Sequence, residues 1–113
     1  IYTRHAGKGF LGVTDDDMEG MRAATEPYAS LNAGRVKEIL GSTWGLSETG
    51  ATGPTGNRYG DDAGHSCIAV SGPVSRSRTI ETGSNNRQEN MISFSIAALE
   101  LLIESLQSKE AST

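Results

Sequence analysis

The sequence predicts a mixed α/β domain, and three observations lead to that prediction. Two short apolar runs, at residues 44–49 and 65–71, flank a long polar loop rich in Gly, Thr and Asp. An apolar stripe with helical spacing precedes this unit, and a broad apolar segment follows it between residues 84 and 106. With 113 residues the chain suits one domain, which we place at residues 1–106, followed by a polar tail at residues 107–113.

The first part of the chain predicts the end of a strand and a short helix. Ile1 and Tyr2 are typical of a strand end, and residues 3–12 carry apolar side chains at helix-compatible spacing, although glycines weaken that helix. Thr14 then precedes consecutive aspartates, as at a helix N-cap with acidic residues in the first turn. Adjacent aspartates do not converge on one cation without help from elsewhere, so we interpret them as a solvated helix start rather than a metal site.

A second helix is predicted from Thr25 to Gly41. The triplet Thr25-Glu26-Pro27 is a good helix opening, because the N–H that proline lacks would have no partner in the first turn. Gly41 can end the helix. Apolar side chains then recur at helical steps and form one stripe: Ala29, Ala33, Val36 and Leu40.

Three strands and a final helix are predicted after Gly41. The first two strands run from Trp44 to Thr49 and from His65 to Ser71, and an alternating third strand covers residues 75–82. The third strand carries few large apolar side chains, so we expect it near an edge of the sheet.

The final helix is expected to open at Ser84 and Asn85. Its apolar side chains cover more than a narrow stripe, which predicts packing on two sides. We expect the polar tail at residues 107–113 to fray.

Composition excludes several classes of function. The net charge of −4 argues against a nucleic-acid backbone as the main partner. The single cysteine, Cys67, excludes an internal disulfide, fits a reducing compartment and lies in an apolar run, where we expect a buried, inert thiol. No unbroken apolar run approaches the roughly 20 residues that cross a bilayer, and no signal peptide is visible. We therefore expect a cytoplasmic protein that binds neither nucleic acid nor membrane.

The loop after the first strand and the order of the elements are similar to those of a known family. The segment from Glu48 to Gly56, with sequence Glu-Thr-Gly-Ala-Thr-Gly-Pro-Thr-Gly, is similar to a Thr-Gly-Ile-Ala-Gly-Pro-x-Gly-Gly loop. Thr25-Glu26-Pro27 is similar to a Ser-Glu-x helix start. Together they resemble the CinA C-terminal domain of competence/damage-inducible proteins and nicotinamide mononucleotide deamidases. The resemblance implies a three-layer α/β/α domain with a mixed sheet, here lacking its first strand and helix.

The resemblance also implies an activity. The deamidases hydrolyse the carboxamide of nicotinamide mononucleotide to nicotinic acid mononucleotide and ammonia, with a serine, a tyrosine and a lysine. The serine belongs to an Ala-Glu-Ser-x-Thr-Gly-Gly motif that this chain does not contain. The tyrosine matches Tyr2, whereas the lysine position holds Gly7, with Lys8 one step later. That step rotates a helical side chain by about 100°. Lys8 is therefore either a displaced catalytic residue or a solvated lysine, and Tyr2 either lines the site or is an ordinary strand tyrosine.

The Gly-rich loop is the candidate binding site for a phosphate-bearing ligand. Such a ligand needs convergent N–H donors and positive charge, which Arg58, Arg76, Arg78 or Arg87 could supply. The alternative is a tight turn with Arg87 in solvent. The loop matches neither the Walker A motif nor the dinucleotide fingerprint. The candidate substrate-binding residues are Thr49, Gly50, Thr52, Gly53, Pro54, Thr55, Gly56 and Arg87.

No cofactor and no metal site are expected. Asp61, Asp62 and His65 match no strong zinc spacing, so we interpret them as hydrogen-bonded loop residues. The expected partners are a small nucleotide that resembles nicotinamide mononucleotide and further copies of the chain. The alternative is a catalytically inactive CinA-like domain that binds nucleotide or phosphate, or that oligomerises through its last helix.

Overall fold

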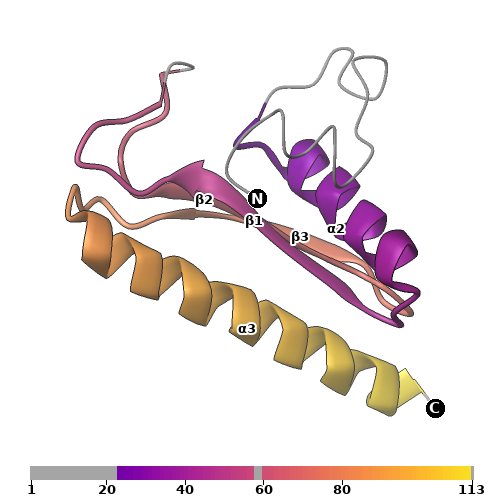
Figure 1. Cartoon of the computed structure of the whole chain (residues 1–113). Helices are drawn as coiled ribbons and strands as arrows, with labels where there is room; N and C mark the ends of the chain where they lie inside the picture. The colour runs from indigo at the N-terminus through magenta and orange to yellow at the C-terminus, as the bar shows by residue number, and fades with distance from the viewer. Residues whose placement is uncertain (1–22, 58–59, 113) are drawn as a thin grey trace.

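Two helices cover opposite faces of a three-stranded sheet in the computed structural model, which describes residues 23–57 and 60–112 (Figure 1). The predicted α/β class is confirmed. The strand end expected at Ile1 and Tyr2, and the helices expected at residues 3–12 and after Thr14, lie outside the described residues. The described elements are α2 (Glu26–Leu40), β1 (Gly45–Ala51), β2 (His65–Ser71), β3 (Arg76–Glu81) and α3 (Arg87–Ser112).

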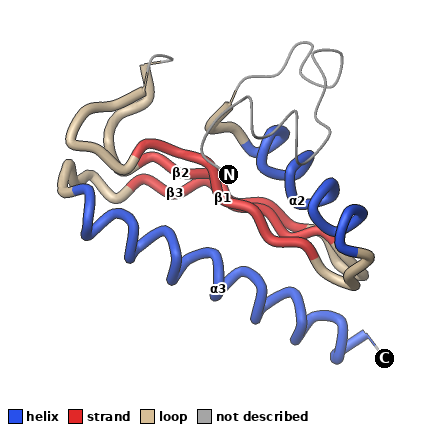
Figure 2. Tube along the Cα trace, viewed as in Figure 1, coloured by secondary structure: helices blue, strands red, loops and turns tan. Residues whose placement is uncertain are grey.

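The strands follow the order β1-β2-β3, and both pairs are antiparallel. β2 is buried from His65 to Val70 because α2 and α3 cover both of its faces (Figure 2). β3 is exposed except at Ile80, as predicted for a strand near an edge. Within the described residues both strand pairs are antiparallel, and the parallel pair expected of a mixed sheet is not among them.

The two faces of the sheet have different cores. On the α2 face, Ala29 and Ala33 pack on Cys67 and Ala69. These small side chains let the backbones approach closely, and a Cβ added at Gly45 would lie 2.1 Å from the carbonyl oxygen of Ala33. Cys67 is 2% exposed and burial raises the pKa of its thiol, which confirms the prediction of a buried cysteine. The α3 face carries the larger side chains Ile68, Val70 and Leu101, with Ala98 among them.

Local signals set the two ends of α2. The Thr25 hydroxyl accepts a hydrogen bond from the N–H of Tyr28 at 3.5 Å, and Pro27 occupies the first turn. Gly41 ends the helix with a φ of 60°, a left-handed conformation that glycine adopts at little cost. The predicted start and end of this helix are confirmed.

α3 departs from the prediction in three respects. It begins at Arg87, after Asn86, whose side chain accepts a hydrogen bond from the N–H of Glu89 at 3.0 Å. It continues to Ser112, through the tail that we expected to fray, because that tail contains good helix formers. The predicted packing on two sides is wrong, because Phe94 and Leu101 are buried against the sheet while the opposite side of the helix is exposed.

The segment of α3 at residues 87–108 is long enough, and on average apolar enough, to cross a membrane. It is the one such helix among the described residues. Sequence inspection missed this property because polar residues such as Ser95 and Glu104 interrupt the apolar run. One side of the helix lies on the sheet, and 22% of the segment is buried, whereas the core helix of a soluble protein that satisfies the same criteria is mostly buried.

Candidate functional site

The Gly-rich loop and the first turn of α3 enclose an open cavity of about 590 Å³. Most of the predicted binding residues line it, together with three residues that we had not selected, Glu48, Ala51 and Asn57. Pro54 instead faces a neighbouring cavity of about 530 Å³. The predicted residues in the first cavity are Thr49, Gly50, Thr52, Gly53, Thr55, Gly56 and Arg87.

Close backbone contacts require glycine at all three predicted glycine positions of the loop, and two of them bear on its contacts with other elements. A Cβ at Gly50 would lie 2.2 Å from the carbonyl oxygen of His65. Gly53 has a φ of 103°, and a Cβ there would lie 2.8 Å from the carbonyl oxygen of Asn85. The loop therefore lies directly against the segment that leads into α3, which explains why Arg87 reaches it.

Asn90 attaches the loop to the start of α3. Its side chain is buried, and its Nδ2 donates to the carbonyl oxygens of Thr52 at 2.9 Å and Ser84 at 2.8 Å. Its Oδ1 accepts a hydrogen bond from the Thr82 hydroxyl at 2.6 Å. The side chain of Asn90, in the first turn of α3, thus bonds both the Gly-rich loop that follows β1 and the segment that follows β3. Sequence reasoning did not select Asn90, although an amide among the apolar residues of a helix signals a buried hydrogen-bonding role.

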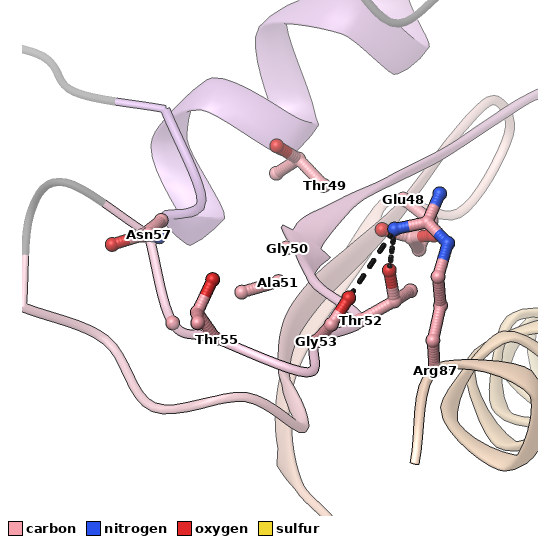
Figure 3. A pocket seen from close by; sticks show the side chains of 10 residues that line it. Glu48, Thr49, Gly50, Ala51, Thr52, Gly53, Thr55, Asn57 and Arg87 are labelled. Carbon is pink, nitrogen blue, oxygen red and sulfur yellow. Dashed lines mark hydrogen bonds between the residues drawn. The ribbon is translucent and has the colours of Figure 1, made fainter. Parts of the chain in front are cut away.

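Arg87 brings a positive charge to the rim of the cavity. Its Nη1 donates to the Thr52 hydroxyl at 2.8 Å and to the Gly53 carbonyl oxygen at 3.4 Å (Figure 3). Both acceptors are neutral, and no carboxylate within residues 23–57 and 60–112 forms an ion pair with Arg87. The guanidinium is therefore held in place while its charge stays available to an anion.

The other candidate arginines are placed differently. Arg78 forms an ion pair with Glu104 of α3 at 2.7 Å, and Arg76 donates a hydrogen bond to Ser108. Arg58 lies outside the described residues. Among the described arginines, Arg87 is thus the one that lines the cavity.

Glu48 adds a carboxylate to the wall of the cavity. The Ser66 hydroxyl donates a hydrogen bond to its Oε2 at 3.1 Å. Partial burial raises the pKa of the Glu48 carboxyl, and the hydrogen bond from Ser66 opposes that rise only in part. The sequence signal for this residue is an acidic side chain inside a strand, immediately before the Thr-Gly pair of the loop.

His65 is the first residue of β2 after the loop, and both of its ring nitrogens face acceptors. Nδ1 bonds the carboxylate of Glu81, and Nε2 lies 2.7 Å from the carbonyl oxygen of Ala24 and 3.7 Å from Oδ2 of Asp61. Burial alone would lower the pKa of His65, but the bonds to Glu81 and Ala24 and the charges of Glu81 and Asp61 raise it. The arrangement favours an imidazolium that donates from both nitrogens.

The His65 cluster (His65, Glu81, Asp61 and the Ala24 carbonyl) joins three parts of the chain: the end of the loop, β3 and the entry to α2. Asp61 also accepts a hydrogen bond from Asn57 at 2.9 Å, so the prediction that Asp61 and His65 are hydrogen-bonded residues is confirmed. No group of three His, Cys, Asp or Glu side chains able to hold a metal occurs in the described part of the chain.

The two candidate catalytic residues, Tyr2 and Lys8, lie outside the described residues. Their catalytic roles stay predictions from the resemblance.

Comparison with known proteins identifies the family. The CinA C-terminal domain matches residues 1–106. The chain belongs to this family. A CinA-like protein of Nostoc sp. (strain PCC 7120) is 38% identical over 72 residues, which cover 64% of this chain and 17% of that protein. A CinA-like protein of Desulfosudis oleivorans is 30% identical over 102 residues, which cover 89% of this chain and 25% of that protein.

Solved structures of CinA-superfamily proteins share the fold. A competence-damaged (CinA) superfamily protein of Klebsiella pneumoniae aligns with a TM-score of 0.86 at 17% identity, over 95% of this chain and 67% of the other. The corresponding protein of Escherichia coli gives a TM-score of 0.81 at 21% identity, over 90% and 59% of the two chains. This CinA-family chain therefore spans a quarter or less of the two curated relatives, and 59% and 67% of the two solved structures.

Proposed function

We propose that this CinA-family chain contributes the nucleotide-binding loop of a nicotinamide mononucleotide amidohydrolase. We further propose that the enzyme is a longer protein that carries this domain, since the curated relatives extend well beyond the part that this chain matches. The observation that carries the proposal is the charge of Arg87, held by Thr52 and Gly53 at the rim of a cavity lined by the Gly-rich loop. A mononucleotide phosphate requires such a fixed cation beside exposed backbone N–H groups.

The cavity also suits the other end of that ligand. Nicotinamide mononucleotide carries a positively charged pyridinium ring as well as a phosphate. Glu48 and Arg87, which line the same cavity, carry the charges complementary to the ring and to the phosphate. Opposite charges that meet in a partly desolvated site stabilise each other more strongly than they would in water. We assign the phosphate to Arg87 and the loop, and the cationic ring to Glu48.

In the proposed reaction the serine of the longer protein attacks the carboxamide carbon. The carbon–nitrogen bond then breaks, ammonia leaves with the serine proton, and water hydrolyses the resulting ester to nicotinic acid mononucleotide and free serine. Tyr2 and Lys8 are the proposed proton carriers of this chain. The loop holds the substrate and excludes alternative orientations, and no metal or cofactor takes part.

One observation favours a second role, which is binding without turnover. The position at which the resemblance expects a lysine holds Gly7, and Lys8 follows one position later. On a helix, such a step would turn the lysine side chain by about 100° from the orientation that the deamidases use. In this second role the cavity and its charges bind the nucleotide, and no hydrolysis follows.

Ammonia release from nicotinamide mononucleotide by the longer protein tests the enzymatic proposal. We expect release by the wild type and by Arg35→Gln, which removes a cation on α2 that pairs with Glu38. We expect a KM at least tenfold higher for Arg87→Gln, because a hydrogen bond to a charged group contributes about 1.5–3 kcal/mol. Binding without ammonia would establish the second role, and neither binding nor ammonia would contradict both.

We place this function in the cytoplasm, since the single cysteine is buried and unpaired. We also propose that the protein forms homo-oligomers, for which the exposed side of α3 provides the surface.

A further inference from the structure

Thr49 and Asn57, on the wall of the cavity (Figure 3), are each connected to the buried His65 through one other residue. The Thr49 hydroxyl accepts a hydrogen bond from the N–H of Ala24 at 3.2 Å. The carbonyl oxygen of the same Ala24 lies 2.7 Å from Nε2 of His65. Because Ala24 is 3% exposed, water does not readily replace either bond. The first connection therefore runs from His65 through Ala24 to Thr49.

Ala24 needs these bonds to keep its backbone conformation. Its φ is 59°, in the left-handed region that a residue with a Cβ rarely adopts. Such strain persists only where the surrounding structure holds the residue in place. The Cys67 thiol also donates to the Ala24 carbonyl oxygen, at 3.4 Å, but a thiol is a weak donor. Loss of the bond from His65 should therefore release Ala24, and with it the donor to Thr49.

The second connection runs from His65 through Asp61 to Asn57. Three hydrogen bonds join Asp61 to Asn57, two of them through the Asn57 side chain at 2.9 and 3.2 Å and one from its backbone N–H at 3.1 Å. Oδ2 of Asp61 lies 3.7 Å from Nε2 of His65, and the side chains of Asp61 and His65 are 14% and 9% exposed. A carboxylate with so little access to water is stabilised by a nearby positive charge. The charge of the His65 ring therefore stabilises the arrangement of Asp61 and Asn57.

Both connections require that the imidazole of His65 carries its second proton. The ring faces three acceptors, which are the carboxylate of Glu81 at Nδ1 and the oxygens of Ala24 and Asp61 at Nε2. A neutral imidazole has one N–H. It keeps the stronger bond, to the charged acceptor Glu81, and then turns the lone pair of Nε2 toward the oxygen of Ala24. Removal of one proton therefore breaks the bond to Ala24 and also removes the charge beside Asp61.

The titratable groups of the neighbouring elements keep their charge between about pH 6.5 and pH 9. The Cys67 thiol lies 3.9 Å from Nε2 of His65, and burial raises its pKa, so it stays protonated. Glu26, at the start of α2, accepts hydrogen bonds from Ser77 and Thr79 of β3, which lower its pKa, so it stays ionised. Near neutral pH, the change of charge in this cluster is therefore that of the imidazole.

We propose that His65 is a positioning residue of the cavity: its doubly protonated ring holds Thr49 and Asn57 where a nucleotide meets them, so nucleotide affinity falls when the ring loses a proton. This inference rests on the proposed function, which supplies the nucleotide. His65 acts through Ala24 and Asp61 and touches no ligand itself.

The direction of the pH effect follows from the surroundings of His65. Burial lowers its pKa, but the bonds to Glu81 and Ala24 and the nearby carboxylates raise it above the ordinary value near 6.5. The positioned wall is therefore present below pH 6.5 and is lost as the pH rises through the folded pKa. Since binding and protonation are reciprocal, a bound nucleotide should in turn raise the pKa of His65. Glu48 acts in the opposite direction, because its protonation at acid pH weakens binding of the cationic ring, so affinity should be highest between the two titrations.

Calorimetric titration of nicotinamide mononucleotide into the full chain at pH 6.5 and pH 9 tests the proposal. The second pKa of a phosphate monoester is about 6, so the ligand keeps most of its charge over this range. We expect wild-type affinity to fall about fivefold between the two pH values, at the lower end of couplings between sites. The control His5→Gln, which removes the other histidine of the chain, should show the same fall, and His65→Gln should lose it. Circular dichroism checks that both variants are folded.

The outcomes separate this inference from the proposed function. A wild type that binds equally well at both pH values, or a fall of the same size in His65→Gln, would overturn the inference and leave the proposed function intact. A wild type that binds at neither pH would contradict the proposed function, and a measurement without ligand then decides whether His65 positions the wall.

NMR titration of the ligand-free chain is that measurement. The ring signal of His65, identified by its loss in His65→Gln, gives the pKa, and the backbone amide signals of Thr49 and Asn57 should shift with the same midpoint. Glu81→Gln removes a carboxylate that raises this pKa, on a side chain that is 59% exposed and does not line the cavity, so the midpoints should move together to lower pH. Amide signals of Thr49 and Asn57 that do not follow the ring of His65 would overturn the proposal.

Discussion

Two cationic groups lie near the Gly-rich loop, and their surroundings differ. His65, the first residue of β2 after the loop, is buried and is bonded to the Glu81 carboxylate and the Ala24 carbonyl, with Asp61 nearby. Arg87, at the start of α3, is exposed and bonded to the neutral oxygens of Thr52 and Gly53. The first charge is neutralised within the protein, so it stabilises the fold. The second is positioned but not neutralised, so it can meet a ligand.

The largest expected effect concerns Asn90, which attaches the loop to the start of α3. Asn90→Ala removes three hydrogen bonds and leaves the carbonyl oxygens of Thr52 and Ser84 without their donor. Because each unpaired buried group costs about 1–3 kcal/mol, we expect a loss of about 3 kcal/mol in unfolding free energy by urea denaturation. Asn86→Ala, which removes a helix cap at the surface, should cost about 1 kcal/mol. Equal losses would contradict the role given to Asn90.

A smaller loss is expected where the loop meets the start of α3. Gly53→Ala places a Cβ 2.8 Å from the carbonyl oxygen of Asn85 at a φ of 103°. We expect about 2 kcal/mol of destabilisation, from backbone strain of about 1–3 kcal/mol, and weaker nucleotide binding. Gly60→Ala is the matched control, because Gly60 also has a positive φ but nothing lies within 4 Å of its Cβ position. If both variants bind nucleotide equally, the close approach of the loop to α3 is not needed for binding.

His65 predicts a pH dependence of stability. Its folded pKa is raised above the ordinary value near 6.5, so its contribution is fully present below pH 6.5 and is lost as the pH rises through the folded pKa. We expect the unfolding free energy, and with it the urea midpoint, to fall between pH 6 and pH 9; the loss in free energy is about 1.5 kcal/mol, the lower end for a hydrogen bond to a charged group.

The variant His65→Gln separates this residue from other titrating groups. It should be less stable than the wild type at pH 6, and its midpoint should change little between pH 6 and pH 9. A midpoint that still falls by the same amount would assign the pH dependence to another group.

The smallest expected effect concerns Glu48. We expect Glu48→Gln to weaken binding of nicotinamide mononucleotide severalfold and to leave binding of inorganic phosphate unchanged, since an exposed or partly exposed charge pair contributes about 0.2–1 kcal/mol. Wild-type affinity for the cationic ligand should also decrease at acid pH, as the carboxyl with its raised pKa becomes protonated. Competition titrations between the two ligands at pH 5 and pH 7.5 measure both effects.

The sequence predicted the parts of the molecule that local chemistry determines. Thr25 and Gly41 cap α2 with their own side chain and backbone, and the alternation of β3 follows from its exposure. The loop was selected as a site because its glycines let the backbone present several N–H donors to a ligand. In the structure Gly53 uses this freedom and adopts a positive φ.

Other features depend on contacts between distant residues and could not be predicted. Arg78 is neutralised by an ion pair with Glu104, which lies far from β3 in the sequence, whereas Arg87 has no such pair among the described residues. The sequence alone therefore could not tell which arginine keeps a charge available to a ligand. The bond between Glu48 and Ser66 depends on the pairing of β1 with β2. The exposed side of α3 was mistaken for a second packed side, because composition alone does not distinguish an apolar surface from a core.

Calorimetric titration of nicotinamide mononucleotide into the full chain, as wild type, Arg87→Gln and Arg35→Gln, tests the central claim most directly. We predict equal affinity for the wild type and Arg35→Gln, and an affinity about 10- to 100-fold lower for Arg87→Gln, with all three equally folded. Unchanged affinity in Arg87→Gln would contradict the claim that this guanidinium is held at the cavity to meet an anion.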